Sequence, residues 1–272
     1  MNDKAIGIFD SGLGGLCAVR EALKAFPGED IIYFGDSGRV PYGSRSYDII
    51  QKYARQDMNF LMSKDVKIVL VACGTVASVA IGYLKETFPD IPIVGVVESA
   101  CERAVGIARE KQNKRIGVIA TEATISKGAY AKYISRLDAS CEVFSKACPL
   151  FVPLVEYGHT DGDPIAKLAA EKYLSHLGEL GLSSLILGCT HYPLLKNTIG
   201  EVAETELLDV GLCAVHRLKT ELENRDLLSA PGKKGGLDIY ISDEVQNFSR
   251  IASNFLGFDI SFGVKKIDIE KY

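Results

Sequence analysis

The chain has 272 residues, of which 47% are hydrophobic and 24% are charged, and its formal net charge is −4 at pH 7. This length suffices for one large or two modest cores, whereas the slightly acidic balance argues against a nucleic-acid partner or an anionic membrane surface. The longest apolar stretch, residues 68–76, is too short to span a bilayer.

Cysteine usage and the first residues both point to a reducing compartment. The seven cysteines are odd in number and have no regular spacing, which fits free thiols better than a disulfide framework. No Cys-x-x-Cys occurs and the four histidines are scattered, so we expect no metal site. Residues 1–4 lead straight into a strand-like segment without a basic and apolar leader, and we therefore expect a cytoplasmic protein.

Apolar runs alternate with segments of helical period along the chain. The runs cover residues 5–9, 31–34, 67–73, 91–97, 116–120, 141–144, 184–188, 206–208 and 237–241. Segments of helical period cover residues 16–26, 47–62, 77–88, 101–111 and 166–180. This alternation predicts an α/β fold in which mostly parallel sheets are flanked by helices.

The two halves of the chain carry matching landmarks. The runs ending at Ser11 and at Thr121 are each a strand followed by a hydroxyl, and a later run in each half ends in a cysteine, Cys73 or Cys189. The repeat predicts two similar α/β domains facing a central cleft, the first formed by residues 1–97 plus 209–272 and the second by residues 98–208. Residues just past the carboxyl ends of parallel strands are where ligands bind, so each cysteine marks a candidate site.

Two thiols permit a reaction that one thiol does not. One thiolate can remove a proton from one face of a carbon while the opposite thiol returns a proton to the other face. Each thiol has a candidate helper, Asp10 for Cys73 and His191 for Cys189. A single thiol with a base, such as Cys189 with His191, could instead act as a nucleophile, and this alternative stays open.

Hydroxyl groups near the same strand ends suit a carboxylate ligand. Ser11, Thr75, Thr121 and Thr190 supply hydroxyls, and backbone N–H groups after each strand add further donors. An amino acid would satisfy such a site. No lysine lies in a setting typical of pyridoxal phosphate, and the glycines after the first strand lack the spacing of a dinucleotide fingerprint, so we expect no cofactor.

Three segments resemble the motifs of bacterial glutamate racemase. They are residues 7–15 (GIFDSGLGG), residues 33–36 (YFGD) with 41–43 (PYG), and residues 188–194 (GCTHYPL). The match runs in family order from residue 5 to about residue 211. The resemblance implies a cofactor-independent enzyme that interconverts L- and D-glutamate and supplies D-glutamate for peptidoglycan, with a homodimer as the expected assembly.

The resemblance also assigns roles to individual residues. It makes Cys73 and Cys189 the proton donor and acceptor pair, assisted by Asp10 and His191. Substrate contacts fall on Ser11, Tyr42, Gly43, Gly74, Thr75, Thr121 and Thr190, and Glu156 matches a carboxylate close to the histidine. Gly74 departs from the family pattern, which usually has asparagine there, so only a backbone N–H remains at this position.

Three alternatives compete with this interpretation. A racemase of the same superfamily that acts on aspartate or hydantoins would keep both cysteines. A single-cysteine amidohydrolase would use Cys189 and His191 and leave Cys73 structural. A protein that binds an amino acid without catalysis would need no matched thiols.

Overall fold

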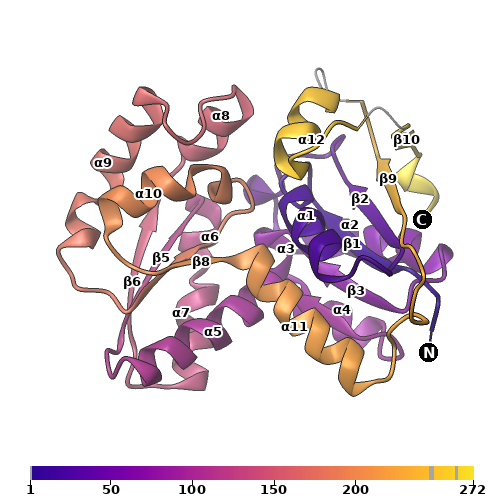
Figure 1. Ribbon diagram of the computed structural model, residues 1–272, viewed down its shortest axis with the longest axis horizontal. Helices are drawn as coiled ribbons and strands as arrows, with labels where there is room; N and C mark the ends of the chain where they lie inside the picture. Colours follow the sequence, from indigo (N-terminus) through magenta and orange to yellow (C-terminus); the bar gives the residue numbers. More distant parts are fainter. Residues whose placement is uncertain (1, 245–247, 261–262) are drawn as a thin grey trace. The chain divides into compact units, whose positions relative to one another are not determined.

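The computed structural model describes residues 2–244, 248–260 and 263–272 (Figure 1). The chain divides into two compact units, Met1–Val96 with Ala214–Tyr272, and Val97–Cys213. The limits expected from sequence, 1–97 plus 209–272 and 98–208, remain a proposal for the folding domains.

The first unit contains a six-stranded parallel sheet in the order β10-β9-β2-β1-β3-β4. Its strands are β1 (Ile6–Asp10), β2 (Ile31–Gly35), β3 (Ile68–Val71), β4 (Ile93–Gly95), β9 (Leu237–Ile241) and β10 (Lys265–Lys266). Its helices are α1 (Leu16–Ala25), α2 (Tyr47–Ser63), α3 (Gly74–Val79), α4 (Ile81–Thr87) and α12 (Phe248–Leu256), with the 3₁₀ turns η1 (Tyr42–Ser44) and η3 (Ile269–Lys271). Helix α11 (Val210–Asn224) begins in the second unit and ends in the first.

Buried central strands account for the continuous apolar runs in the sequence. All residues of β1 and β3 are buried, because helices cover both faces of the sheet. The chain moves from β1 to β2 in one direction and from β2 to β3 in the other, and right-handed crossovers therefore place α1 and α2 on opposite faces. Helix α1 packs beside α12, and α2 packs beside α3 and α4 (Figure 1).

The second unit contains a four-stranded parallel sheet in the order β6-β5-β7-β8. Its strands are β5 (Arg115–Ala120), β6 (Glu142–Ala147), β7 (Ser184–Leu187) and β8 (Leu207–Asp209). Its helices are α5 (Val96–Glu110), α6 (Glu122–Lys127), α7 (Ala129–Leu137), α8 (Phe151–Glu156), α9 (Pro164–Gly178) and α10 (Lys196–Ala203), with the 3₁₀ turn η2 (Tyr192–Leu195). Helices α9 and α10 lie side by side (Figure 1).

Both sheets repeat one strand order, which confirms the predicted fold class of two similar α/β units. The order β2-β1-β3-β4 in the first unit corresponds to β6-β5-β7-β8 in the second. In such sheets ligands bind where the direction of winding reverses, outside the carboxyl ends of the strands. That point lies between β1 and β3 in the first unit and between β5 and β7 in the second.

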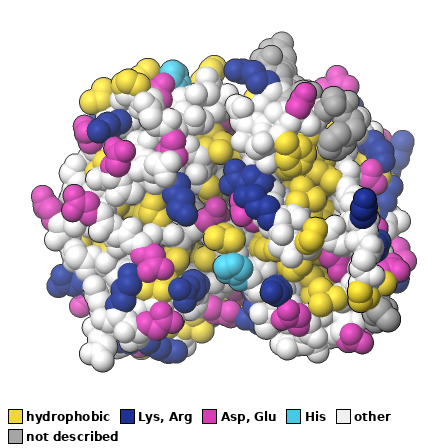
Figure 2. Space-filling view, viewed as in Figure 1, with side chains coloured by type: hydrophobic (Ala, Val, Ile, Leu, Met, Phe, Trp, Pro, Cys, Tyr) yellow, Lys and Arg dark blue, Asp and Glu magenta, His cyan; other side chains and the backbone are white. Residues whose placement is uncertain are grey.

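The surface agrees with the modest net charge. Lysine and arginine side chains are interspersed with aspartate and glutamate on the face seen in Figure 2. In the part of the chain that the structure describes, no helix is both long enough and apolar enough to cross a membrane.

Candidate active site

Cys73 lies at the switch point of the first sheet. It follows β3 and is the N-cap residue of α3, and it is only 4% exposed. Ser11 follows the neighbouring strand β1, and the Cys73 thiol donates a hydrogen bond of 3.3 Å to Ser11 Oγ. The parallel pairing of β1 with β3 therefore brings these two predicted site residues together.

Asp10, the last residue of β1, is buried and fixed by backbone donors. Its Oδ2 accepts hydrogen bonds from the N–H groups of Gly12 (3.1 Å) and Gly15 (3.2 Å). A Cβ atom at Gly15 would lie 2.6 Å from the Asp10 Cβ, so only glycine allows this close approach. The glycine-rich turn thus serves to hold the aspartate in place.

The surroundings of Cys73 favour its neutral thiol. Burial and the negative charge of Asp10 raise the pKa of Cys73 to about 12, against the opposing hydrogen bonds of Ser11 and the Val76 backbone. Asp10 as a carboxylate disfavours a thiolate at Cys73. The role expected for Asp10 as a helper of Cys73 stays a prediction.

The Tyr42–Gly43 segment lies beside α3, which starts at Gly74 and Thr75. The Tyr42 side chain is buried, and its hydroxyl donates to Asp36 Oδ2 and lies 3.1 Å from Asp57 Oδ2. The phenol is therefore committed to these buried carboxyl groups, and any contact from this segment to a ligand would come from its backbone.

Cys189 lies at the equivalent switch point of the second sheet, directly after β7 and Gly188. Its Sγ is 3.8 Å from His191 Nδ1, and His191 Nε2 is 3.3 Å from Glu156 Oε1. The His191 side chain is 13% exposed and that of Glu156 is 51% exposed. The three residues form a chain of contacts from the half-exposed Glu156 carboxylate through the His191 imidazole to the Cys189 thiol.

The His191 imidazole is held in its charged form. Burial opposes the charge, but hydrogen bonds with Cys189 and Glu156 outweigh it and raise the pKa of His191 to about 10. The two thiols thus have opposite surroundings, with an anion near Cys73 and a cation near Cys189.

The two predicted threonines of this unit differ in their roles. Thr190 is buried beside Cys189. Thr121 caps α6: its Oγ1 accepts from the Thr124 N–H at 3.4 Å and donates to Thr124 Oγ1 at 3.1 Å. A capping role satisfies this hydroxyl without any ligand.

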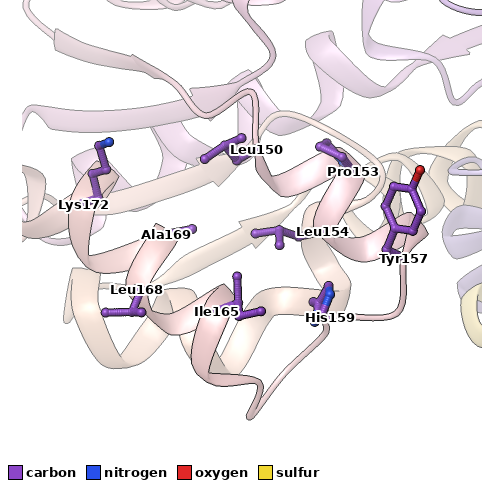
Figure 3. Close-up of a pocket in the computed structure, with 9 residues that line it drawn as sticks. All are labelled: Leu150, Pro153, Leu154, Tyr157, His159, Ile165, Leu168, Ala169 and Lys172. Atoms are coloured by element: carbon purple, nitrogen blue, oxygen red, sulfur yellow. The ribbon is translucent and has the colours of Figure 1, made fainter.

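An apolar groove of about 460 Å³ lies between α8 and α9 (Figure 3). Its lining residues are Leu150, Pro153, Leu154, Tyr157, His159, Ile165, Leu168, Ala169 and Lys172. None of the predicted site residues lines it, although α8 also carries Glu156. Among the described residues, no group of three His, Cys, Asp or Glu side chains is arranged to hold a metal ion.

Comparison with known proteins decides the family. A family model described as Asp/Glu/Hydantoin racemase matches residues 17–218. The chain belongs to this racemase family. It is 45% identical to a glutamate racemase of Geobacter metallireducens, with 93% of each chain covered, and 40% identical to one of Thermoanaerobacter pseudethanolicus, with both chains covered completely.

Solved structures of the racemase family agree with this assignment. The structure of Francisella tularensis glutamate racemase in complex with D-glutamate matches with a TM-score of 0.89 at 34% identity, and the match covers 100% of both chains. The predicted resemblance to glutamate racemases is confirmed, as is the expectation that the chain is a racemase.

Proposed function

We propose that this racemase interconverts L- and D-glutamate without a cofactor, using Cys73 and Cys189 as acid and base on opposite faces of the substrate. One observation carries the proposal. Equivalent strands of the two sheets end near the two thiols, and Cys73 lies near the Asp10 anion whereas Cys189 lies beside the His191 cation. A two-base exchange needs one protonated and one ionised group at the start, and the two thiols lie in settings that differ in the way such an exchange requires.

In the proposed step the Cys189 thiolate removes the α-proton, so that an S–H bond forms and the Cα–H bond breaks. The electron pair stays on the substrate as a carbanion whose charge spreads into its carboxylate. The Cys73 thiol then gives its proton to the other face of Cα and becomes a thiolate. Reaction of the opposite enantiomer runs the same transfers in reverse.

Substrate recognition is proposed to rest on hydroxyl and backbone donors. Thr75, at the start of α3, and Thr190, beside Cys189, are the predicted hydroxyls nearest to the two thiols in sequence, and Gly74 can offer its N–H. Hydrogen bonds to a charged carboxylate are stronger than those between neutral groups, so a few such donors suffice to orient it.

The cellular role follows from the same proposal. We propose that the product D-glutamate is used for peptidoglycan, that the enzyme acts in the cytoplasm and that it forms a homodimer. All seven cysteines are free, which fits a reducing compartment. Sedimentation of the purified protein at several concentrations tests the homodimer.

The decisive experiment follows circular dichroism of the purified protein with D-glutamate, D-aspartate or a hydantoin, without added cofactor. We expect the circular dichroism signal of D-glutamate to decay to zero as the racemic mixture forms. Cys73→Ser and Cys189→Ser should each abolish racemisation, because a hydroxyl is far too weak an acid for this exchange. Cys141→Ser, a change at a half-buried cysteine before β6, is the matched control and should remain active.

The single variants also test the direction of each thiol. Each serine variant should still eliminate a leaving group from one enantiomer only of a β-substituted glutamate analogue, since elimination needs one base. Full racemisation by either serine variant would exclude the two-base mechanism. Faster turnover of aspartate or a hydantoin than of glutamate would assign the chain to another substrate of the family.

A second candidate function is amide hydrolysis by Cys189 alone, favoured by its line of contacts to His191 and Glu156. In that case Cys73→Ser would keep full activity on an amide while Cys189→Ser would lose it. The family assignment favours the racemase, because relatives named glutamate racemase match along the whole chain.

A further inference from the structure

A buried cluster of carboxyl groups supports the Tyr42–Gly43 segment. Asp36, which follows β2, and Asp57, on α2, are both fully buried. The Tyr42 hydroxyl lies between them, contacting Oδ2 of each carboxyl group. Arg39 donates from Nε to Asp36 Oδ2 at 2.6 Å and from Nη2 to Asp57 Oδ1 at 3.2 Å.

The hydrogen bonds of this cluster require one proton more than the tyrosine supplies. The Tyr42 hydroxyl has a single proton but contacts two carboxyl oxygens, so one carboxyl group must donate. A proton on Asp36 Oδ2 would face the Arg39 Nε–H, which donates to this oxygen at 2.6 Å, and a proton on Asp36 Oδ1 would find no acceptor among the described residues. Asp57 Oδ1 accepts from Arg39, which leaves Asp57 Oδ2 to donate to the Tyr42 oxygen.

We propose that Asp57 is a neutral acid that acts with Asp36 and Tyr42 as a positioning unit, fixing η1 against α3 and so placing the Tyr42–Gly43 backbone for substrate. The positioning role rests on the proposed function. Because η1 packs against α3, whose N-cap is Cys73, a shift of η1 would move backbone donors next to this thiol.

Electrostatics around the cluster support the neutral acid. Burial and the charge of Asp36 raise the pKa of Asp57 well above its ordinary range, and Arg39 opposes this only in part. Among the described residues, the charged or titratable groups that face Asp57 are Asp36, Arg39, Tyr42, Asp10 and, through Arg39, Glu270. Two ionised carboxylates beside one guanidinium would leave a net negative charge in a buried site, which is costly.

Four variants test the proposal: Asp57→Asn, Asp57→Ala, Tyr42→Phe and, as a control on the same helix, Asp48→Asn, whose side chain is exposed. An asparagine at position 57 can donate to Tyr42 and accept from Arg39, as the neutral acid does. We expect Asp57→Asn to keep the KM for glutamate, and Asp57→Ala and Tyr42→Phe to raise KM by about tenfold with little change in kcat. If Asp57→Ala does not fold, Tyr42→Phe carries this comparison.

Thermal unfolding tests the proton without using activity. The folded chain binds the Asp57 proton more tightly than the unfolded chain, so this contribution to stability is complete below the ordinary carboxyl pKa and is lost as pH rises through the folded pKa. The Tm of Asp57→Asn minus that of the unmodified protein should therefore grow between about pH 5 and about pH 9. The same difference for Asp48→Asn should stay constant.

The outcomes separate this inference from the proposed function. An unmodified protein that does not racemise glutamate would overturn the proposed function, while the Tm series would still decide whether Asp57 is neutral. A constant Tm difference, or an Asp57→Asn variant as impaired as Asp57→Ala, would overturn the neutral acid. An unchanged KM in both Asp57→Ala and Tyr42→Phe would overturn the positioning role.

Discussion

Replacing Ser11 by alanine tests whether the Ser11 hydroxyl stabilises the thiolate that Cys73 needs in order to act as a base. The thiol is 4% exposed, and its pKa is raised to about 12 by burial and by the charge of Asp10. Ser11 Oγ, 3.3 Å from the sulfur, is the side chain whose hydrogen bond works against this shift. In the thiolate state the hydroxyl can turn and donate its proton to the sulfur.

The size of the expected loss in kcat follows from the charge of the Cys73 thiolate, which Ser11→Ala would leave without the hydroxyl donor. A hydrogen bond to a charged group contributes roughly 1.5–3 kcal/mol, which corresponds to about ten- to 150-fold in rate. In the proposed mechanism every turnover passes through a Cys73 thiolate, as a product in one direction and as the starting base in the other. Ser11→Ala should therefore lower kcat for both enantiomers.

Circular dichroism in both directions, with substrate varied, separates this effect from substrate binding. Loss of a thiolate donor lowers kcat, whereas loss of a substrate contact raises KM. Since L- and D-glutamate are equally stable, kcat/KM must stay equal for the two enantiomers in every variant. The matched control is Ser78→Ala, whose hydroxyl donates to the Gly74 carbonyl within α3. A Ser11→Ala variant with kcat within about twofold of the unmodified protein would refute the reasoning, because the expected loss is at least tenfold.

Four further variants test charged groups and one backbone position. His191→Asn should lower kcat by more than about a hundredfold, the usual contribution of an acid–base group, whereas Glu156→Gln should cost at most about fivefold because exposed pairs contribute roughly 0–1 kcal/mol. Glu156→Gln also removes one of the groups that raise the pKa of His191. The alkaline loss of activity, expected near pH 10 in the unmodified protein, should therefore move to lower pH in a pH–rate profile. An unchanged alkaline side of the profile would argue against a role of the His191–Glu156 pair. Lys67→Met leaves the buried Glu29 carboxylate without its cation and should reduce the free energy of unfolding in urea by about 3–5 kcal/mol; a loss below about 1 kcal/mol would mean that the pair contributes little. Gly74→Asn, at a helical position, should lower the KM for glutamate by up to about tenfold by adding one hydrogen bond, and an unchanged KM would show that the backbone donors suffice.

Strands were predictable because both sheets are covered on their two faces. Each of the nine apolar runs overlaps a strand, and the central strands β1, β3 and β7 need no polar alternation because they are buried. The strand β10, Lys265–Lys266, was missed because two exposed lysines carry no apolar signal. The helical segment expected at 77–88 is two helices, α3 and α4, which meet at Ala80.

The positions of the two thiols were predictable, but their chemical surroundings were not. A cysteine that follows an apolar run lies at a strand end whatever the rest of the chain does. The contact between Cys73 and Ser11 joins residues 62 positions apart and depends on β1 pairing with β3. The contacts of the Tyr42 hydroxyl depend on Asp36, which follows β2, and Asp57, on α2, both reaching this side chain, and no local pattern reveals that.

Matching topology does not make the two thiols equivalent, and this difference is what the proposed chemistry requires. If both strand ends carried the same neighbours, the two thiols would share one pKa, and neither would be favoured as the starting base. Asp10 near Cys73 disfavours an anion there, whereas Cys189 lies beside the His191 cation. After one turnover Cys73 is the thiolate and Cys189 the thiol. The neighbours that stabilise the starting state therefore raise the free energy of this product state. We therefore expect the enzyme to show unequal kcat and KM for the two enantiomers, with equal kcat/KM, and identical kcat values in both directions would mean that these neighbours do not set the resting protonation of the thiols.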